Sequence, residues 1–146
     1  MRFEFGDVDG VSRPFVLFRL VQDASGTVGR ALVDTGSAHT VLPASFAPLF
    51  VDSHAARYIS ELRLGGYVDR HVPQYEADML IVSVDGREAL PVSVPVLVSS
   101  LDLPFPVFGD TVLRHVVLVV RAHEGVLHVL ARGRFADSPH LPDESF

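Results

Sequence analysis

The segment Ala31-Leu-Val-Asp34-Thr35-Gly36-Ser37-Ala-His-Thr-Val-Leu-Pro43 places an acidic residue after an apolar run and before a turn. A carboxylate buried in such a position either finds a partner or has a raised pKa, and both outcomes are used in catalysis. The other interpretation of Asp34 is a turn residue bonded to its own backbone, the commoner fate of an isolated Asp-Thr-Gly. The tripeptide also arises by chance in about 2–3% of chains of this length. The segment therefore needs a second signal before it indicates chemistry.

A second signal lies later in the chain, in Pro106-Val-Phe-Gly109-Asp110-Thr-Val-Leu-Arg114, followed by an apolar run over residues 116–120. Between the two segments, two arms in which apolar and polar residues alternate meet at Gly65-Gly66. The alternation gives each arm one side that faces water. It predicts a projecting hairpin, although an ordinary edge hairpin fits equally well. The apolar members of the two arms are Tyr58, Leu62, Leu64, Tyr75, Ala77 and Met79.

Composition and turn signals favour one globular domain built mainly from β-strands. The chain has 146 residues, of which 48% are hydrophobic and 21% charged, with 11 Gly and 10 Pro. Its short, Val-rich apolar runs are separated by turn dipeptides, as the strands of hairpins are. We expect core strands over residues 15–21 and 92–98, because both faces of each run are apolar. The dipeptides are Asp9-Gly10, Ser25-Gly26, Gly65-Gly66, Asp85-Gly86 and Glu124-Gly125.

Two short helices are expected among the strands. One covers residues 43–49, and the other is a turn that begins at Asp110, whose carboxylate is expected to cap the amides that follow. Residues 1–132 are predicted to form the single folded domain. Residues 133–146 are polar, and we expect them to form a flexible tail.

Charge and residue types exclude several classes of partner and site. A net charge of -6 argues against nucleic acid, and the absence of cysteine removes disulfides and thiolate metal sites. His123 and His128 would face opposite sides of a strand, and no His-Glu-x-x-His or nucleophile-elbow motif occurs, so we predict no metal and no cofactor. No apolar stretch is long enough to span a bilayer or serve as a signal. We therefore expect a cytoplasmic protein that does not bind membranes.

The quoted segments together resemble those of aspartic proteases. The first is similar to their hydrophobic-hydrophobic-Asp-Thr-Gly-Ser loop, and the second to the apolar-apolar-Gly-Asp-x-x-Leu-Arg segment of a pepsin lobe. The arms that meet at Gly65-Gly66 resemble a flap, and the whole resemblance covers about residues 15–130. Because the chain has one Asp-Thr-Gly, it resembles the single-lobe retropepsins, which dimerise. The resemblance implies an all-β, closed acid-protease barrel with a flap hairpin.

The resemblance also implies a function. The chain is expected to be an aspartic endopeptidase that hydrolyses peptide bonds in extended, hydrophobic-flanked polypeptide segments. The catalytic groups would be Asp34 and its symmetry mate in a homodimer, because two equivalent acids must share one site. From a different functional class, the alternative is a catalytically inactive dimeric β-barrel that binds peptides or scaffolds a partner protein.

Roles for the loop around Asp34 follow by the same resemblance. Thr35 is matched to a threonine whose hydroxyl reaches across the two-fold axis to the other subunit. Gly36 lets the backbone approach the acid pair and the substrate. Ser37 is expected to donate its hydroxyl proton to the carboxylate, which favours the charged form and predicts an acidic pH optimum.

The substrate-binding positions are also carried over. Leu64, Gly65 and Gly66 match the flap tip, which would close over an extended peptide and bond to its backbone. The residues matched to side-chain pockets are mostly apolar. The second motif departs from retropepsins, because Gly109-Asp110-Thr111 lacks the arginine that these enzymes use in a dimer contact. The matched pocket positions are Leu32, Ala38, His39, Val41 and Val107.

Overall fold

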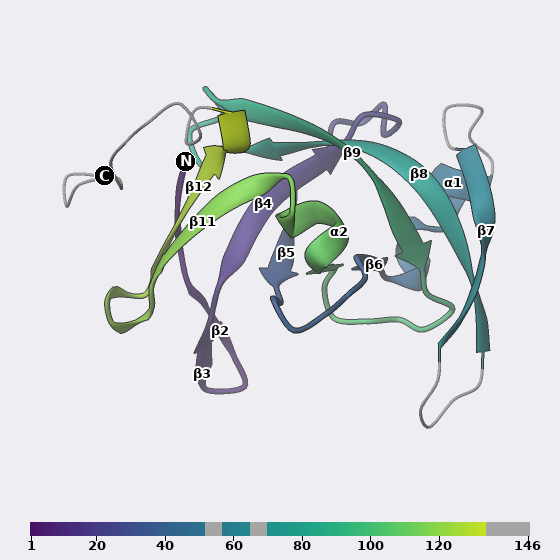
Figure 1. Cartoon of the computed structure of the whole chain (residues 1–146), viewed down its shortest axis with the longest axis horizontal. Helices are drawn as coiled ribbons and strands as arrows, with labels where there is room; N and C mark the ends of the chain where they lie inside the picture. Colours follow the sequence, from purple (N-terminus) through teal and green to yellow (C-terminus); the bar gives the residue numbers. More distant parts are fainter. Residues whose placement is uncertain (52–56, 65–69, 134–146) are drawn as a thin grey trace.

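The computed structural model describes residues 1–51, 57–64 and 70–133, and its centre is a closed barrel of six strands (Figure 1). β8 pairs antiparallel with both β9 and β4, and this second pairing closes the barrel. The predicted all-β, closed barrel is therefore confirmed. In order around the barrel the strands are β4 (Phe15–Leu20), β5 (Gly29–Val33), β10 (Val107–Phe108), β6 (Val41–Leu42), β9 (Ala89–Val98) and β8 (Arg70–Val82).

Three further groups of strands surround the barrel. β7 (Arg57–Leu64) pairs with β8 and extends the sheet outward. A separate three-stranded sheet has the order β1 (Arg2–Glu4), β12 (Val126–Ala131) and β11 (Val116–Arg121). The hairpin of β2 (Gly6–Val8) and β3 (Val11–Arg13) follows β1.

Four of the five predicted turn dipeptides lie between strands as expected, and the fifth, Gly65-Gly66, is outside the described residues. Asp9 and Gly10 link β2 to β3 with φ values of 51° and 81°, the left-handed pair that a tight two-residue hairpin requires. Gly26, Gly86 and Gly125 also have positive φ, in the connections β4–β5, β8–β9 and β11–β12. Glycine suits these three turns because a residue with a Cβ is strained at positive φ, and each turn ends one strand and starts the next.

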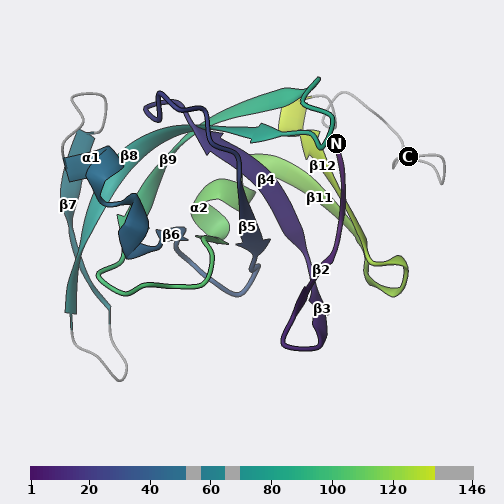
Figure 2. The same cartoon turned by 180° about the vertical axis from the view of Figure 1, so that it is seen from behind.

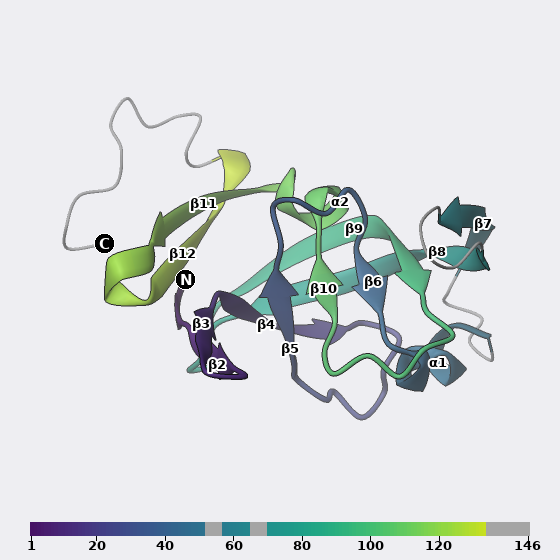
Figure 3. The same ribbon diagram turned by 90° about the horizontal axis from the view of Figure 1, so that it is seen from below.

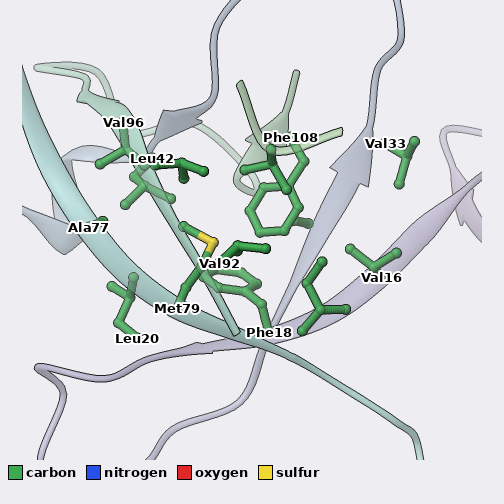
Figure 4. Packing of buried hydrophobic residues seen from close by; sticks show 14 of the residues in the cluster. Val16, Phe18, Leu20, Val33, Leu42, Ala77, Met79, Val92, Val96 and Phe108 are labelled. Atoms are coloured by element: carbon green, nitrogen blue, oxygen red, sulfur yellow. The ribbon is translucent and has the colours of Figure 1, made fainter. Parts of the chain in front are cut away.

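The barrel interior is filled by aromatic and branched side chains. The predicted core strands are confirmed as β4 and β9, with Phe18 and Val94 almost fully buried. Phe18 from β4 lies against Phe108 from β10, with ring centroids 5.0 Å apart (Figure 4). This contact anchors the short strand β10, which has only two residues, inside the barrel wall.

The predicted hairpin exists, and Figure 2 shows β7 and β8 extending away from the barrel. On β8 the residues Tyr75, Ala77 and Met79 are buried while Asp78 is exposed, which confirms the predicted alternation on that arm. The pairing runs to Leu64 and Arg70. The expected tip, Gly65 and Gly66, lies outside the described residues, as does the expected tail beyond Gly133.

The helices are short and lie close to the predicted positions. Residues 43–49 contain a 3-10 turn (Ala44–Phe46) and the start of α1 (Pro48–Val51). α2 (Asp110–Leu113) confirms the second helix, but the predicted cap is wrong. Gly109 is the N-cap residue, and the Asp110 carboxylate accepts hydrogen bonds from Arg114 because both side chains project on the same side of this turn. A further 3-10 turn (Ala122–Glu124) links β11 to β12.

Within the described part of the chain, no helix has the length and apolar character needed to cross a membrane.

The burial of His128 on β12 leads us to predict that the folded protein becomes less stable in acid. Its side chain is almost fully buried, and this burial lowers its pKa from the ordinary 6.5, helped by the positive charges of Arg121, the Met1 amino group and Arg2 and opposed by Glu124. At a pH just below 6.5, His128 is therefore protonated to a greater extent in the unfolded chain than in the folded chain. The free energy of unfolding should fall as the pH drops below about 6.5.

Urea denaturation of wild type and His128→Gln between pH 7.5 and 5 measures this effect. The variant should lose less stability over that range. His123→Gln removes a histidine whose side chain is 83% exposed and should keep the wild-type pH dependence. Equal pH dependence in wild type and His128→Gln would contradict the role of His128.

Candidate active site

The loop that carries Asp34, residues 34–40, leaves the barrel at the end of β5 and returns at β6. β10 lies between these two strands, parallel to β5 and antiparallel to β6 (Figure 3). The pairing aligns Val107 with both Leu32 and Val41. The second sequence signal, which begins at β10, is thus inserted between the two strands that support the first.

Hydrogen bonds join the two segments directly. The Asp34 amide donates to the Phe108 carbonyl over 3.0 Å, and the Asp110 amide donates to the Ser37 carbonyl over 2.8 Å. Two bonds on opposite sides of the turn fix the backbone that presents Asp34, Thr35 and Gly36.

Gly109 sits where no side chain fits. A Cβ placed on this residue would lie 2.2 Å from the His39 carbonyl oxygen and 2.6 Å from that of Ser37. Both neighbours are backbone atoms, so neither can turn away as a side chain could. The glycine of the second motif therefore allows the two loops to touch.

Thr40 is a site residue that the sequence analysis does not identify. It is fully buried, and its hydroxyl oxygen accepts hydrogen bonds from the Gly109 amide at 3.2 Å and from the Thr111 hydroxyl at 2.8 Å. The side chain thereby ties the far end of the Asp34 loop to the start of α2. The available signal was a threonine that precedes the apolar pair Val41-Leu42.

Asp34 itself is exposed, so the expectation that it is buried is wrong for the single chain. β5 ends at Val33, and the following turn carries the carboxylate out of the barrel wall. Its Oδ1 accepts a hydrogen bond from the Gly36 amide at 3.0 Å, which confirms the local turn geometry of the second interpretation. Within the described residues, no cationic side chain forms an ion pair with Asp34. One face of the carboxylate is left open at the surface.

The predicted role of Ser37 is also wrong in this structure. Its hydroxyl donates to the His39 carbonyl over 2.8 Å, because the turn brings that carbonyl over the Ser37 side chain. A hydroxyl has one proton to donate, so the same proton is not given to Asp34. The prediction of an acidic pH optimum, which depended on a hydrogen bond from Ser37 to Asp34, is therefore not supported by this contact.

The proposed pocket residues divide into two groups. Leu32, Val107 and Val41 lie opposite one another on three adjacent strands and are each half-buried. Paired residues share a face of a sheet, so these three form one apolar row beside the Asp34 loop, while Val33, Phe108 and Leu42 fill the core behind it.

The remaining predicted residues lie on the loop or on the hairpin. Ala38 is exposed and His39 half-buried, both within the Asp34 loop, where Thr35 and Gly36 are also exposed. Leu64 ends β7, at the outer end of the hairpin. In the described ranges no group of three His, Cys, Asp or Glu side chains is arranged to hold a metal ion.

Substitution of Gly109 by Ala tests the close approach of the two loops. The added methyl group must displace the backbone of His39, so we expect a loss of about 1–3 kcal/mol in the free energy of unfolding, measured by urea denaturation. Gly133→Ala is the matched control, because a Cβ there meets nothing within 4 Å. Wild-type stability in Gly109→Ala would show that the loops do not pack as described.

No protein-family model matches the sequence, and no curated protein matches it significantly. The structure is similar to the crystal structure of a retropepsin-like aspartic protease from Rickettsia conorii, with a TM-score of 0.59 and 14% sequence identity over 88% of this chain and 89% of that one. It also matches EIAV protease complexed with the inhibitor HBY-793, with a TM-score of 0.44 and 22% identity over 75% of this chain and 92% of that one. The Rickettsia structure confirms the resemblance at the level of the fold: this chain has the retropepsin-like aspartic-protease fold.

Proposed function

We propose that the chain is an aspartic endopeptidase whose active unit is a homodimer with Asp34 from each subunit at its centre. The observation that carries the proposal is the Asp34 loop. In a barrel of this fold, the Gly109-Asp110 segment holds that loop by main-chain bonds and leaves the carboxylate open. One chain supplies one such acid, so a second copy must supply the other.

Two acids side by side provide an acid and a base together. Carboxylates about 3 Å apart cannot both be ionised, so the pair keeps one shared proton, as is established for aspartic-protease dyads. This proton belongs to the pair and not to either residue.

The reaction uses both protonation states at once. The ionised carboxylate removes a proton from a water molecule, whose oxygen attacks the peptide carbonyl carbon, while the protonated carboxylate donates a hydrogen bond to the carbonyl oxygen. Collapse of the tetrahedral intermediate breaks the C–N bond. The departing nitrogen takes a proton from the dyad, which returns to its starting state with one shared proton.

The substrate proposed is an extended polypeptide with apolar residues near the cut bond. The half-buried row of Leu32, Val107 and Val41 lies next to the loop and offers apolar surface for such side chains. Ala38 and the half-buried His39 add no acidic group to this surface. The β7–β8 hairpin would cover the peptide from the other side.

Asp34→Asn tests the proposed chemistry. The substitution keeps the shape of the side chain and removes its acid-base function, so cleavage of an unstructured, apolar-rich polypeptide should fall by at least about 10²–10⁴-fold. Product formation is measured by mass spectrometry over a range of pH. Asp85→Asn removes the same charge from an exposed β8–β9 turn and should leave the rate unchanged.

Equal cleavage by wild type and Asp34→Asn would overturn the proposal. Peptide binding without cleavage in the wild type would favour the inactive peptide-binding barrel instead.

A further inference from the structure

A surface cavity, the Arg30 cavity, lies between β1 and the barrel. Its volume is about 490 Å³, and pockets for small molecules usually measure about 300–1,000 Å³. Figures 1 and 2 show the chain from the N terminus to β2 and the start of β4 coming together on this side of the molecule. None of residues 34–40 lines the cavity, so it is separate from the Asp34 loop. Its apolar walls are formed by Phe3, Phe5, Phe15, Leu17 and Val84.

Arg30 on β5 is held at the wall of this cavity by an aromatic contact. Its Cζ atom lies 4.4 Å from the centre of the Phe15 ring. Phe15 is held edge-on by Phe105, with ring centroids 5.2 Å apart. A cation over the face of an aromatic ring is attracted by the quadrupole of the ring. The contact therefore restricts the orientation of an arginine that is otherwise exposed.

Gly6 makes room for this contact. A Cβ placed on Gly6 would lie 2.9 Å from Nη1 of Arg30 and 3.0 Å from Cδ2 of Phe15. A side chain at position 6 would press on both members of the pair. The glycine thus lets the guanidinium and the ring meet beside the cavity.

The guanidinium of Arg30 has unused hydrogen-bond donors. Over residues 1–51, 57–64 and 70–133, it forms no ion pair and no hydrogen bond, and the contact with Phe15 is its one interaction. That contact occupies a face of the guanidinium, while the N–H donors lie in its plane and point outward from its edges. This planar fork matches the two oxygens of a carboxylate. The cavity therefore offers a positioned donor set to an anionic group.

The other charged residues of the lining limit the charge of a ligand. Nη1 of Arg2 lies 3.7 Å from Oε1 of Glu4, and both side chains are exposed. These two charges offset each other, so the lining has a net charge of one, supplied by Arg30. A single carboxylate balances that charge, whereas Glu4 would repel a second negative charge.

We propose that the Arg30 cavity binds a small monocarboxylate with an apolar body. The carboxylate lies on the Arg30 guanidinium, and the apolar part contacts Phe3, Phe5 and Phe15. The net charge of the lining and its apolar walls both favour this ligand over a neutral molecule or a dianion. A free aliphatic acid and the C-terminal residue of an apolar peptide share this chemistry. The inference is independent of the proposed function.

Titration of the full chain with octanoate, followed through amide chemical shifts, tests the proposal. The amide signals of Gly6, Leu17 and Val84 should move as octanoate is added. Arg30→Gln should weaken octanoate binding by about 10–100-fold, because it removes a charge-assisted hydrogen bond. Arg87→Gln is the matched control, since Arg87 is exposed on the β8–β9 turn and does not line the cavity, and it should leave the affinity unchanged.

Two further ligands separate the roles of charge and apolar chain. Octan-1-ol has the chain without the charge, so it should bind wild type at least about tenfold more weakly than octanoate and be insensitive to Arg30→Gln. N-acetylleucine carries a carboxylate in the form of a peptide C-terminus. Binding of either acid that depends on Arg30 supports the site, and the tighter of the two identifies the source of the carboxylate.

Two variants with opposite expected effects sharpen the test. Glu4→Gln should tighten octanoate binding by about two- to fivefold, because it removes a repelling carboxylate and leaves Arg2 unpaired. Gly6→Ala should weaken it, because the added methyl group displaces Arg30 from Phe15. Weaker binding in Glu4→Gln would contradict the charge balance described for the lining.

Three results would overturn the proposal. The first is an absence of shifts at the cavity with both acids. The second is equal affinity of wild type and Arg30→Gln for octanoate, and the third is octan-1-ol binding as tightly as octanoate.

Discussion

The structure around the candidate site depends on the contact between Gly109 and the backbone of the Asp34 loop. The carbonyl oxygens of Ser37 and His39 approach Gly109 so closely that even a methyl group has no room. This approach lets the Asp110 amide reach Ser37 and lets Thr40 bond to the Gly109 amide. The loop that presents Asp34 is therefore joined to the second segment by main-chain packing and by Thr40, while the Asp34 carboxylate makes only a local bond with the Gly36 amide.

The same contact links the site to the rest of the molecule. β10 enters the barrel wall through Phe108, which packs on Phe18 in the core. α2 follows Gly109 at once and delivers the chain to β11. The stretch from β10 to β11, residues 107–121, therefore contributes to the core, holds the loop that presents Asp34 and leads into the strand β11.

The sequence predicts features that depend on local rules, and it fails where tertiary contacts decide. The turn at Asp9-Gly10 and the buried strands β4 and β9 follow from left-handed φ values and from apolar faces, which are local properties. The prediction that Asp34 is buried was wrong, because an apolar run in the sequence does not show at which residue the strand leaves the barrel. The acceptor to which the Ser37 hydroxyl donates is the His39 carbonyl, and Thr40 accepts from the Gly109 amide. Both contacts form only when the folded loop places these main-chain groups beside the two side chains, so the sequence could not predict them.

Mixing subunits tests the central claim, that one site is built from two copies, most directly. Wild-type protein is held at a fixed concentration and the Asp34→Asn chain is added in increasing excess, with cleavage rate as the readout. The account predicts that activity falls toward zero, because each wild-type subunit becomes paired with a partner that lacks the second acid. Undiminished activity at large excess, with exchange of subunits verified by mass spectrometry, would show that a single chain carries the whole reaction.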